Sequence, residues 1–220
     1  MKRAAAEILR TYGPFPDAAQ VGGVSYDGRR VWFAAGDRLH AFDPRSGEMV
    51  RSLAVAGQAG TAFDGRHLFQ IARDRILEID PESGGVLATI PAPGGEGCSG
   101  LAWAEGTLWV GRYRARQIHQ IDPRTGAVLR TIASDRFVTG VCWVEGELWH
   151  GTWEGEESEL RRVDAGTGEV LESLVMPPGV GVSGLEADGG ERFFCGGGDS
   201  GTVRLVRRPR RGAGKGPAGG

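Results

Sequence analysis

One glutamate in this sequence has surroundings that suit acid–base chemistry. Glu96 lies between two glycines in the segment Pro-Gly-Gly-Glu-Gly-Cys-Ser-Gly-Leu, which spans residues 93–101. Glycines leave room for a ligand to approach the chain closely, and a carboxylate near a reacting group can take up or release its proton. Glu96 is therefore the candidate catalytic residue, and the alternative is a solvated glutamate in a loop.

A second candidate group, for ligand binding, consists of Arg112, Tyr113 and Arg114. Arg116 continues an alternation that would place three guanidinium groups on one face of a strand. Guanidinium groups bind carboxylates and phosphates through paired hydrogen bonds, so these residues could hold an anionic ligand. Glutamates at positions 154, 156, 157 and 159 offer the opposite charge, and a salt-bridged rim is the alternative.

Trp153 is the one tryptophan of six that the repeat described below does not explain. An indole ring in a loop can stack on a ligand or hold a cation over its face, and packing at the edge of a sheet is the alternative. His150 lies nearby and could reach the same ligand, or it could be a packed strand residue. Further candidate ligand-binding residues in loops are Gln58, Cys98, Arg136 and Asp199.

The elements that must position these residues form a fivefold internal repeat. The segments 23–53, 60–90, 99–132, 139–174 and 183–208 align by eye. A period near 40 residues, built from strands and glycine turns, is typical of β-propeller blades. Aromatic residues recur within the units at a separation of about six residues and are expected to stack between neighbouring blades. The turn glycines, at intervals of 37 to 43 residues, are Gly28, Gly65, Gly106, Gly146 and Gly189.

The last unit lacks a fourth strand, and the N-terminus supplies a matching segment. Residues 7–12, Glu-Ile-Leu-Arg-Thr-Tyr, are similar to residues 127–132, Ala-Val-Leu-Arg-Thr-Ile. We therefore predict an all-β fold, a five-bladed β-propeller of four-stranded antiparallel blades, in which the N-terminal strand completes the last blade. Closure of the ring removes the exposed edges that an open array would leave. The candidate site residues would then meet on one face, at the channel mouth.

The predicted organisation is one propeller domain, residues 1–208, followed by a disordered, basic, glycine-rich tail, residues 209–220. The blades are expected at about 21–56, 57–97, 98–137, 138–181, and 182–208 plus the strand at 7–12. Glycine makes up 38 of the 220 residues, well above the usual ~7%, which fits a chain with many turns.

The composition of the chain argues against two classes of binding partner, nucleic acid and membrane. The net charge is −2, but six basic residues and no acidic residue follow position 203. The body of the chain is therefore acidic, which argues against nucleic-acid binding by the fold. No apolar run is long enough to span a membrane, and the N-terminus is a poor signal peptide.

Cysteine usage and the acidic residues bear on compartment and metals. The three cysteines lie far apart and form neither a zinc motif nor a disulfide framework, so we expect a cytoplasmic protein. No cofactor and no metal site is predicted, although Glu96, Glu186 and Asp199 could converge on Ca²⁺. The expected partner is a small molecule or a peptide, bound by a monomer.

The segments Ser-Gly-Leu-Ala-Trp-Ala-Glu-Gly-Thr-Leu-Trp-Val-Gly (99–111) and Ile-His-Gln-Ile-Asp-Pro-Arg-Thr-Gly-Ala-Val-Leu (118–129) resemble the five-bladed bacterial glutamine cyclotransferases, or glutaminyl cyclases. More distantly they resemble streptogramin-lyase-type propellers. Residues 93–101 are similar to a Pro-Gly-Glu-Gly-Trp-Gly-Leu segment of the cyclotransferases, with Cys98 at the tryptophan.

The resemblance implies a glutaminyl-peptide cyclotransferase, an acyltransferase, or a lyase-like enzyme. In cyclisation the substrate α-amine attacks its own side-chain amide and ammonia leaves. Glu96 would then relay a proton, and Arg112 or Tyr113 would face the developing oxyanion. The alternative function is a non-catalytic propeller that binds a ligand or a protein.

Overall fold

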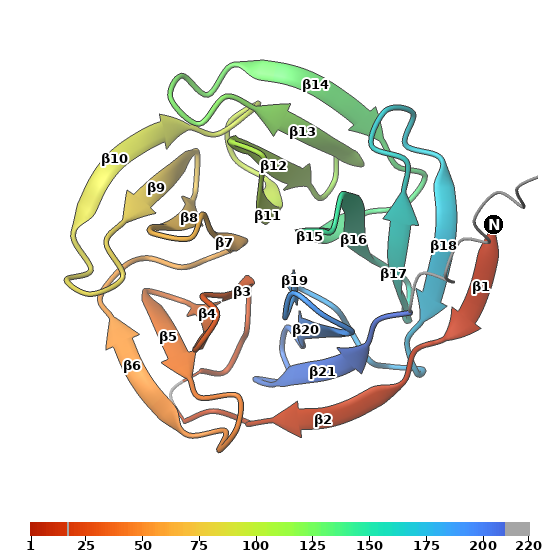
Figure 1. The fold of residues 1–220 in the computed structure, drawn as a ribbon, viewed down its shortest axis with the longest axis horizontal. Helices are drawn as coiled ribbons and strands as arrows, with labels where there is room; N and C mark the ends of the chain where they lie inside the picture. The colour runs from red at the N-terminus through yellow and green to blue at the C-terminus, as the bar shows by residue number, and fades with distance from the viewer. Residues whose placement is uncertain (17, 210–220) are drawn as a thin grey trace, which may run out of the picture.

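The chain folds into five β-sheets around a central axis, as Figure 1 shows. The structure is a computed structural model that describes residues 1–16 and 18–209; this part contains no helix that could cross a membrane. From the axis outward, blade I consists of β3 (Val24–Tyr26), β4 (Val31–Ala35), β5 (Arg38–Phe42) and β6 (Met49–Leu53), and blade II of β7 (Thr61–Phe63), β8 (Leu68–Ala72), β9 (Arg75–Ile79) and β10 (Val86–Pro91). Blade III consists of β11 (Cys98–Ala104), β12 (Thr107–Arg112), β13 (Gln117–Ile121) and β14 (Val128–Ala133), and blade IV of β15 (Val138–Val144), β16 (Glu147–Glu154), β17 (Glu157–Val163) and β18 (Val170–Val175). Blade V consists of β19 (Leu185–Ala187), β20 (Arg192–Gly196), β21 (Val203–Arg207) and β2 (Ile8–Tyr12).

An Asp-Pro-x-[Ser/Thr]-Gly motif, at residues 43–47, 80–84 and 122–126, makes the turn between the third and fourth strands of blades I, II and III. In blade II, Asp80 Oδ1 accepts hydrogen bonds from the backbone N–H groups of Glu82 at 2.7 Å and Ser83 at 2.8 Å. Gly84 has a φ of 76°, a conformation that glycine adopts without a Cβ penalty. In the blades that carry the motif, the local sequence therefore fixes where the outer strand begins.

The recurring aromatic residues pack between neighbouring blades. Phe69 of blade II stacks on Trp103 of blade III with ring centroids 5.3 Å apart, and Trp109 stacks on Trp143 of blade IV at 5.6 Å. Such pairs bury large apolar area and add a modest stacking term. Packing is thus the role of these repeat aromatics.

The N-terminal strand closes the ring, which confirms the sequence prediction. β2 pairs antiparallel with β21, with Ile8 opposite Val206 and Tyr12 opposite Val203. Tyr12 is buried, lies 4.7 Å from the ring of Phe42 in blade I, and donates its hydroxyl to the Pro44 carbonyl oxygen at 2.9 Å. One strand therefore joins the last blade to the first.

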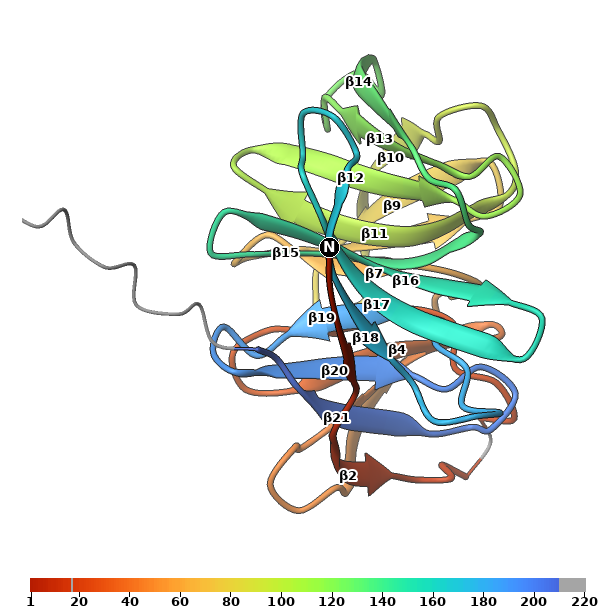
Figure 2. The same ribbon diagram turned by 90° about the vertical axis from the view of Figure 1, so that its right-hand side faces the viewer.

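A fifth strand on blade IV was not predicted. β1 (Lys2–Ala5) pairs in parallel with β18, and the chain then passes from blade IV to blade V as β2 (Figure 2). All four residues of β1 are exposed, and Lys2 pairs with Glu172 at 3.1 Å. With no apolar face, this strand carries no hydrophobic pattern that a sequence reading could detect.

The basic residues that begin the C-terminal stretch belong to the fold. Arg204 and Arg207 lie in β21, and Arg208 is buried, with its guanidinium 2.9 Å from Glu147 and 2.8 Å from Glu145. The positive charge of this segment is therefore partly neutralised inside blades IV and V. The predicted disordered tail lies, from residue 210 on, outside the described residues.

Candidate ligand-binding site

The candidate site lies on the face that carries the loops leading into the inner strands and the loops between second and third strands. Strands within a blade alternate in direction, so these two sets of loops come to one face. A cavity of about 520 Å³, here called the IV–V cavity, opens there. Its lining residues are Tyr113, Thr139, Trp153, Gly179, Gly181, Val182, Ser183, Gly197, Gly198, Asp199, Ser200 and Arg204.

Trp153 forms one wall of the IV–V cavity. It lies near the end of β16, is half-buried, and donates its indole N–H to the Gly155 carbonyl oxygen at 2.9 Å. The ring occupies the space beside Gly181, where an added Cβ would be 1.2 Å from a ring atom. Trp153 therefore lies outside the interblade aromatic pairs and on a cavity wall. Its role in ligand binding stays a prediction.

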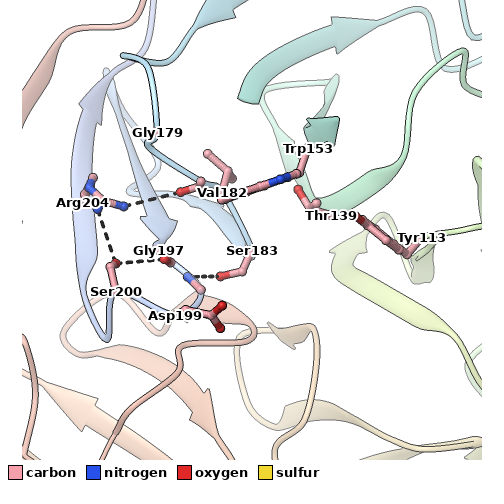
Figure 3. Close-up of a pocket in the computed structure, with 12 residues that line it drawn as sticks. Tyr113, Thr139, Trp153, Gly179, Val182, Ser183, Gly197, Asp199, Ser200 and Arg204 are labelled. Carbon is pink, nitrogen blue, oxygen red and sulfur yellow. Dashed lines mark hydrogen bonds between the residues drawn. The ribbon is translucent and has the colours of Figure 1, made fainter. Parts of the chain in front are cut away.

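Polar groups of blade V continue the cavity wall from the Trp153 ring, as Figure 3 shows. The guanidinium of Arg204 donates to the Gly181 carbonyl oxygen and to Ser200 Oγ, both at 3.4 Å. Asp199 is exposed and accepts a hydrogen bond from Gln20 at 2.7 Å. Asp199 was a sequence candidate, whereas Arg204 was missed because it was counted with the basic tail.

A second cavity beside the axis receives residues from all five blades. It has a volume of about 270 Å³ and is lined by Gly22, Gln58, Ala59, Cys98, Ser99, Tyr113, Thr139 and Ser183. Tyr113, Thr139 and Ser183 also line the IV–V cavity, so the two are continuous. The hydroxyl of Thr139 has no hydrogen-bond partner in the described part of the chain. Thr139 was also missed from the sequence.

Glycines mark the places where the inner parts of neighbouring blades touch. A Cβ on Gly100 would lie 2.4 Å from the Val141 N of blade IV, and one on Gly140 would lie 2.5 Å from the Leu185 N of blade V. Real Cβ atoms are essentially never that close to backbone, so neighbouring inner strands touch here through residues without side chains. The equivalent glycines at the other three junctions are Gly23, Gly60 and Gly184.

Glu96 lies in a different part of the same face. It lines a cavity of about 320 Å³, the II–III cavity, together with Gln58, Ala59, Ile71, Arg73, Gly97 and Cys98. Its side chain is exposed. Gln58 lines both the II–III and the axial cavity, which brings two of the sequence candidates together. The catalytic role of Glu96 stays a prediction.

Cys98 is a buried thiol rather than an exposed nucleophile. Its Sγ lies 3.6 Å from the Pro93 carbonyl oxygen and 3.7 Å from that of Gly95. Burial raises the pKa of Cys98 to about 11, so the thiolate is scarce at neutral pH. Cys98 is placed to shape the cavity wall and to hold the glycine-rich loop.

The candidate arginines do not form one cluster in the structure. Arg112 donates to the Pro93 carbonyl oxygen at 2.7 Å and to that of Glu96 at 3.3 Å, so it ties down the loop that carries Glu96. Arg136 pairs with Glu157 at 3.6 Å, and Arg116 pairs with Glu154 at 2.5 Å. Salt bridges thus occupy Arg116 and Arg136, while Arg114 is exposed. None of these arginines lines the three cavities described above.

His150 and Glu186 lie inside the blades. Burial lowers the pKa of His150 to about 4, so its ring is neutral, and Nδ1 is 3.2 Å from the Gly151 carbonyl oxygen. Burial raises the pKa of Glu186 to about 7, and its Oε1 accepts the Ala187 N–H at 2.8 Å. Within the described residues no three metal-ligating side chains of the His, Cys, Asp or Glu type are grouped, so Glu96, Glu186 and Asp199 do not meet.

These features define a five-bladed β-propeller, closed by its N-terminal strand, with connected cavities on one face. Its fold is similar to that of the Myxococcus xanthus glutaminyl cyclase, with a TM-score of 0.76 and 18% identity over 94% of this chain and 97% of that chain. No family model and no curated protein matches the sequence.

Two further solved structures share the propeller architecture less closely. A chain of a mitotic checkpoint complex gives a TM-score of 0.54 at 14% identity, over 86% of this chain and 78% of that chain. The Kuenenia stuttgartiensis hydrazine synthase gives 0.52 at 19% identity, over 81% of this chain and 56% of that chain. At these identities the likenesses establish the fold alone.

Proposed function

We propose that this propeller binds a small organic molecule or a short peptide in the IV–V cavity. The observation that carries the proposal is the position of Trp153, whose ring forms a wall of a 520 Å³ cavity. A cavity of this size, with an aromatic wall and a few polar groups, is typical of small-ligand sites. In this proposal the protein acts as a cytoplasmic monomer, and neither nucleic acid nor a membrane is its partner.

Replacement of Trp153 tests the proposal. Suitable probes are indole-3-acetate, N-acetylphenylalanine and Phe-containing dipeptides, with dissociation constants measured by isothermal titration calorimetry. We expect Trp153→Ala to weaken binding about tenfold or more, because loss of a stacked ring removes about 1–3 kcal/mol. Trp153→Phe should retain part of the affinity.

Trp103→Phe is the control, because Trp103 is a half-buried tryptophan that stacks between blades. This variant should bind the probes like the wild-type protein. Equal affinity of the wild-type protein and Trp153→Ala, or no binding of any probe by the folded protein, would contradict the proposal.

A second candidate function is cyclisation of N-terminal glutaminyl peptides. It is favoured by the likeness to the Myxococcus xanthus glutaminyl cyclase and by Glu96, which lines the II–III cavity. The α-amine would form a C–N bond to the side-chain amide carbon, the amide C–N bond would break, and ammonia would leave with a proton relayed by Glu96.

Mass spectrometry of glutaminyl peptides tests this second function. Cyclisation by the wild-type protein should appear as loss of ammonia from the peptide. Glu96→Gln should lower the rate by about a hundredfold or more with an unchanged melting temperature, because general acid–base catalysis contributes about 10²–10⁴-fold. A folded wild-type protein that releases no ammonia would exclude this reaction and leave the binding function as it stands.

A further inference from the structure

Arg204 differs from two buried arginines of blades IV and V. The guanidinium of Arg161 lies 2.7 Å from Glu159, and that of Arg208 lies 2.9 Å from Glu147. Arg204 is half-buried, yet in the described part of the chain its guanidinium forms no ion pair and donates two long hydrogen bonds to neutral oxygens, both at 3.4 Å. A partly desolvated cation without a counter-charge is unfavourable unless an anion completes its surroundings.

Trp153 and Arg204 both contact Gly181. The indole ring lies beside the Cα of Gly181, and the Arg204 guanidinium reaches the carbonyl oxygen of the same residue. A ligand in the IV–V cavity can therefore touch the flat apolar surface of Trp153 and the cation of Arg204 at the same time, because both side chains contact Gly181. Figure 3 shows both side chains on the cavity wall, with Ser200 between Arg204 and Gly197.

Asp199 is the acidic residue of the same wall, and its carboxylate is hydrogen-bonded to Gln20 rather than to Arg204. Its Oδ1 accepts the Gln20 amide hydrogen bond at 2.7 Å. Gln20 and Asp199 together line a further cavity of about 280 Å³ toward blade I, which shares Ser183, Gly198 and Asp199 with the IV–V cavity. Burial lowers the pKa of Arg204, but a guanidinium keeps its charge at neutral pH.

From this arrangement we infer that the IV–V cavity binds a small carboxylate with a flat apolar body. The carboxylate pairs with the Arg204 guanidinium, whose planar fork matches two carboxylate oxygens, and the body lies on Trp153. This inference rests on the proposed ligand-binding function and specifies the chemical class of its ligand.

Matched carboxylate and amide probes test the inference. Isothermal titration calorimetry should be carried out with indole-3-acetate and indole-3-acetamide, and with benzoate and benzamide. We expect each carboxylate to bind at least about tenfold more tightly than its amide, because charged hydrogen bonds are stronger than neutral ones. Added salt should weaken only the carboxylates.

Substitutions of Arg204 test whether this residue causes the preference for carboxylates. Arg204→Gln should abolish the preference for carboxylates while Arg204→Lys retains part of it, and melting temperatures confirm that both variants fold. Arg29→Gln is the control. Arg29 is an exposed arginine in the turn between the first and second strands of blade I, on the face of the propeller opposite the cavities. Its replacement changes the net charge of the protein by the same amount as Arg204→Gln.

The possible failures can be told apart. Equal affinity for carboxylate and amide, with binding still dependent on Trp153, would overturn the inference and leave the proposed function intact. A preference that survives in Arg204→Gln would assign the anion to another cation and also overturn it. Absence of binding by every probe would overturn the inference and the proposed function together.

Discussion

A variant that lacks residues 2–12 should fail to give soluble, folded protein. These residues include β2, the outer strand of blade V, and Tyr12, which packs against rings in blades I and V. Their removal leaves β21 as an unpaired edge and opens the contact between the last and first blades. Loss of a buried aromatic side chain alone costs about 3–5 kcal/mol, which is a large part of the stability of a typical domain.

A shorter deletion separates ring closure from a general effect of truncation. Removal of residues 2–5 deletes β1, whose residues are all exposed, and retains β2. We expect this variant to fold, with a melting temperature lowered by only a few degrees. Circular dichroism and size-exclusion chromatography decide the outcome. A soluble variant without residues 2–12 that melts within a few degrees of the full chain would contradict the closure.

Gly140→Val should destabilise the protein by about 3 kcal/mol or more. A Cβ at Gly140 would lie 2.5 Å from the Leu185 N and 2.7 Å from the Gly184 C. Both atoms belong to the backbone at the start of the inner strand of blade V, so relief requires blades IV and V to move apart. Overpacking of a rigid core usually costs about 1–3 kcal/mol, and a backbone clash at the ring centre belongs at the upper end or beyond.

Gly190→Ala is the matched control for the glycine substitution. Gly190 lies in the turn between the first two strands of blade V, and the nearest atom to its added Cβ is Asp188 Oδ1 at 3.4 Å, an ordinary contact. Urea unfolding should place this variant within about 1 kcal/mol of the wild-type protein. If Gly140→Val unfolded at the same urea concentration as Gly190→Ala, the inner strands could not be in the contact described.

Local signals explain why the architecture could be predicted from the sequence. Turn motifs such as that around Asp80 act within a few residues, so they appear directly as a repeating pattern. The closing strand could be found because residues 7–12 copy a pattern seen in another blade. β1 could not, because its four exposed residues pair through backbone and surface charges.

The candidate site could be predicted only in part. Trp153 was found as the tryptophan left over by the repeat, and the structure places it on a cavity wall. The contacts of Arg112 could not be predicted, because its partners are carbonyl oxygens whose direction depends on how the loop at 93–97 folds. Gly100 and Gly140, which touch the next blade, recur at the blade period, so the sequence does carry a signal for them.

A crystal structure of the complex with indole-3-acetate would test the central claim most directly. The account predicts the indole ring of the ligand against Trp153 and its carboxylate within hydrogen-bond distance of the Arg204 guanidinium, in the IV–V cavity. A ligand bound elsewhere on the propeller, or one with its carboxylate turned away from Arg204, would contradict the account.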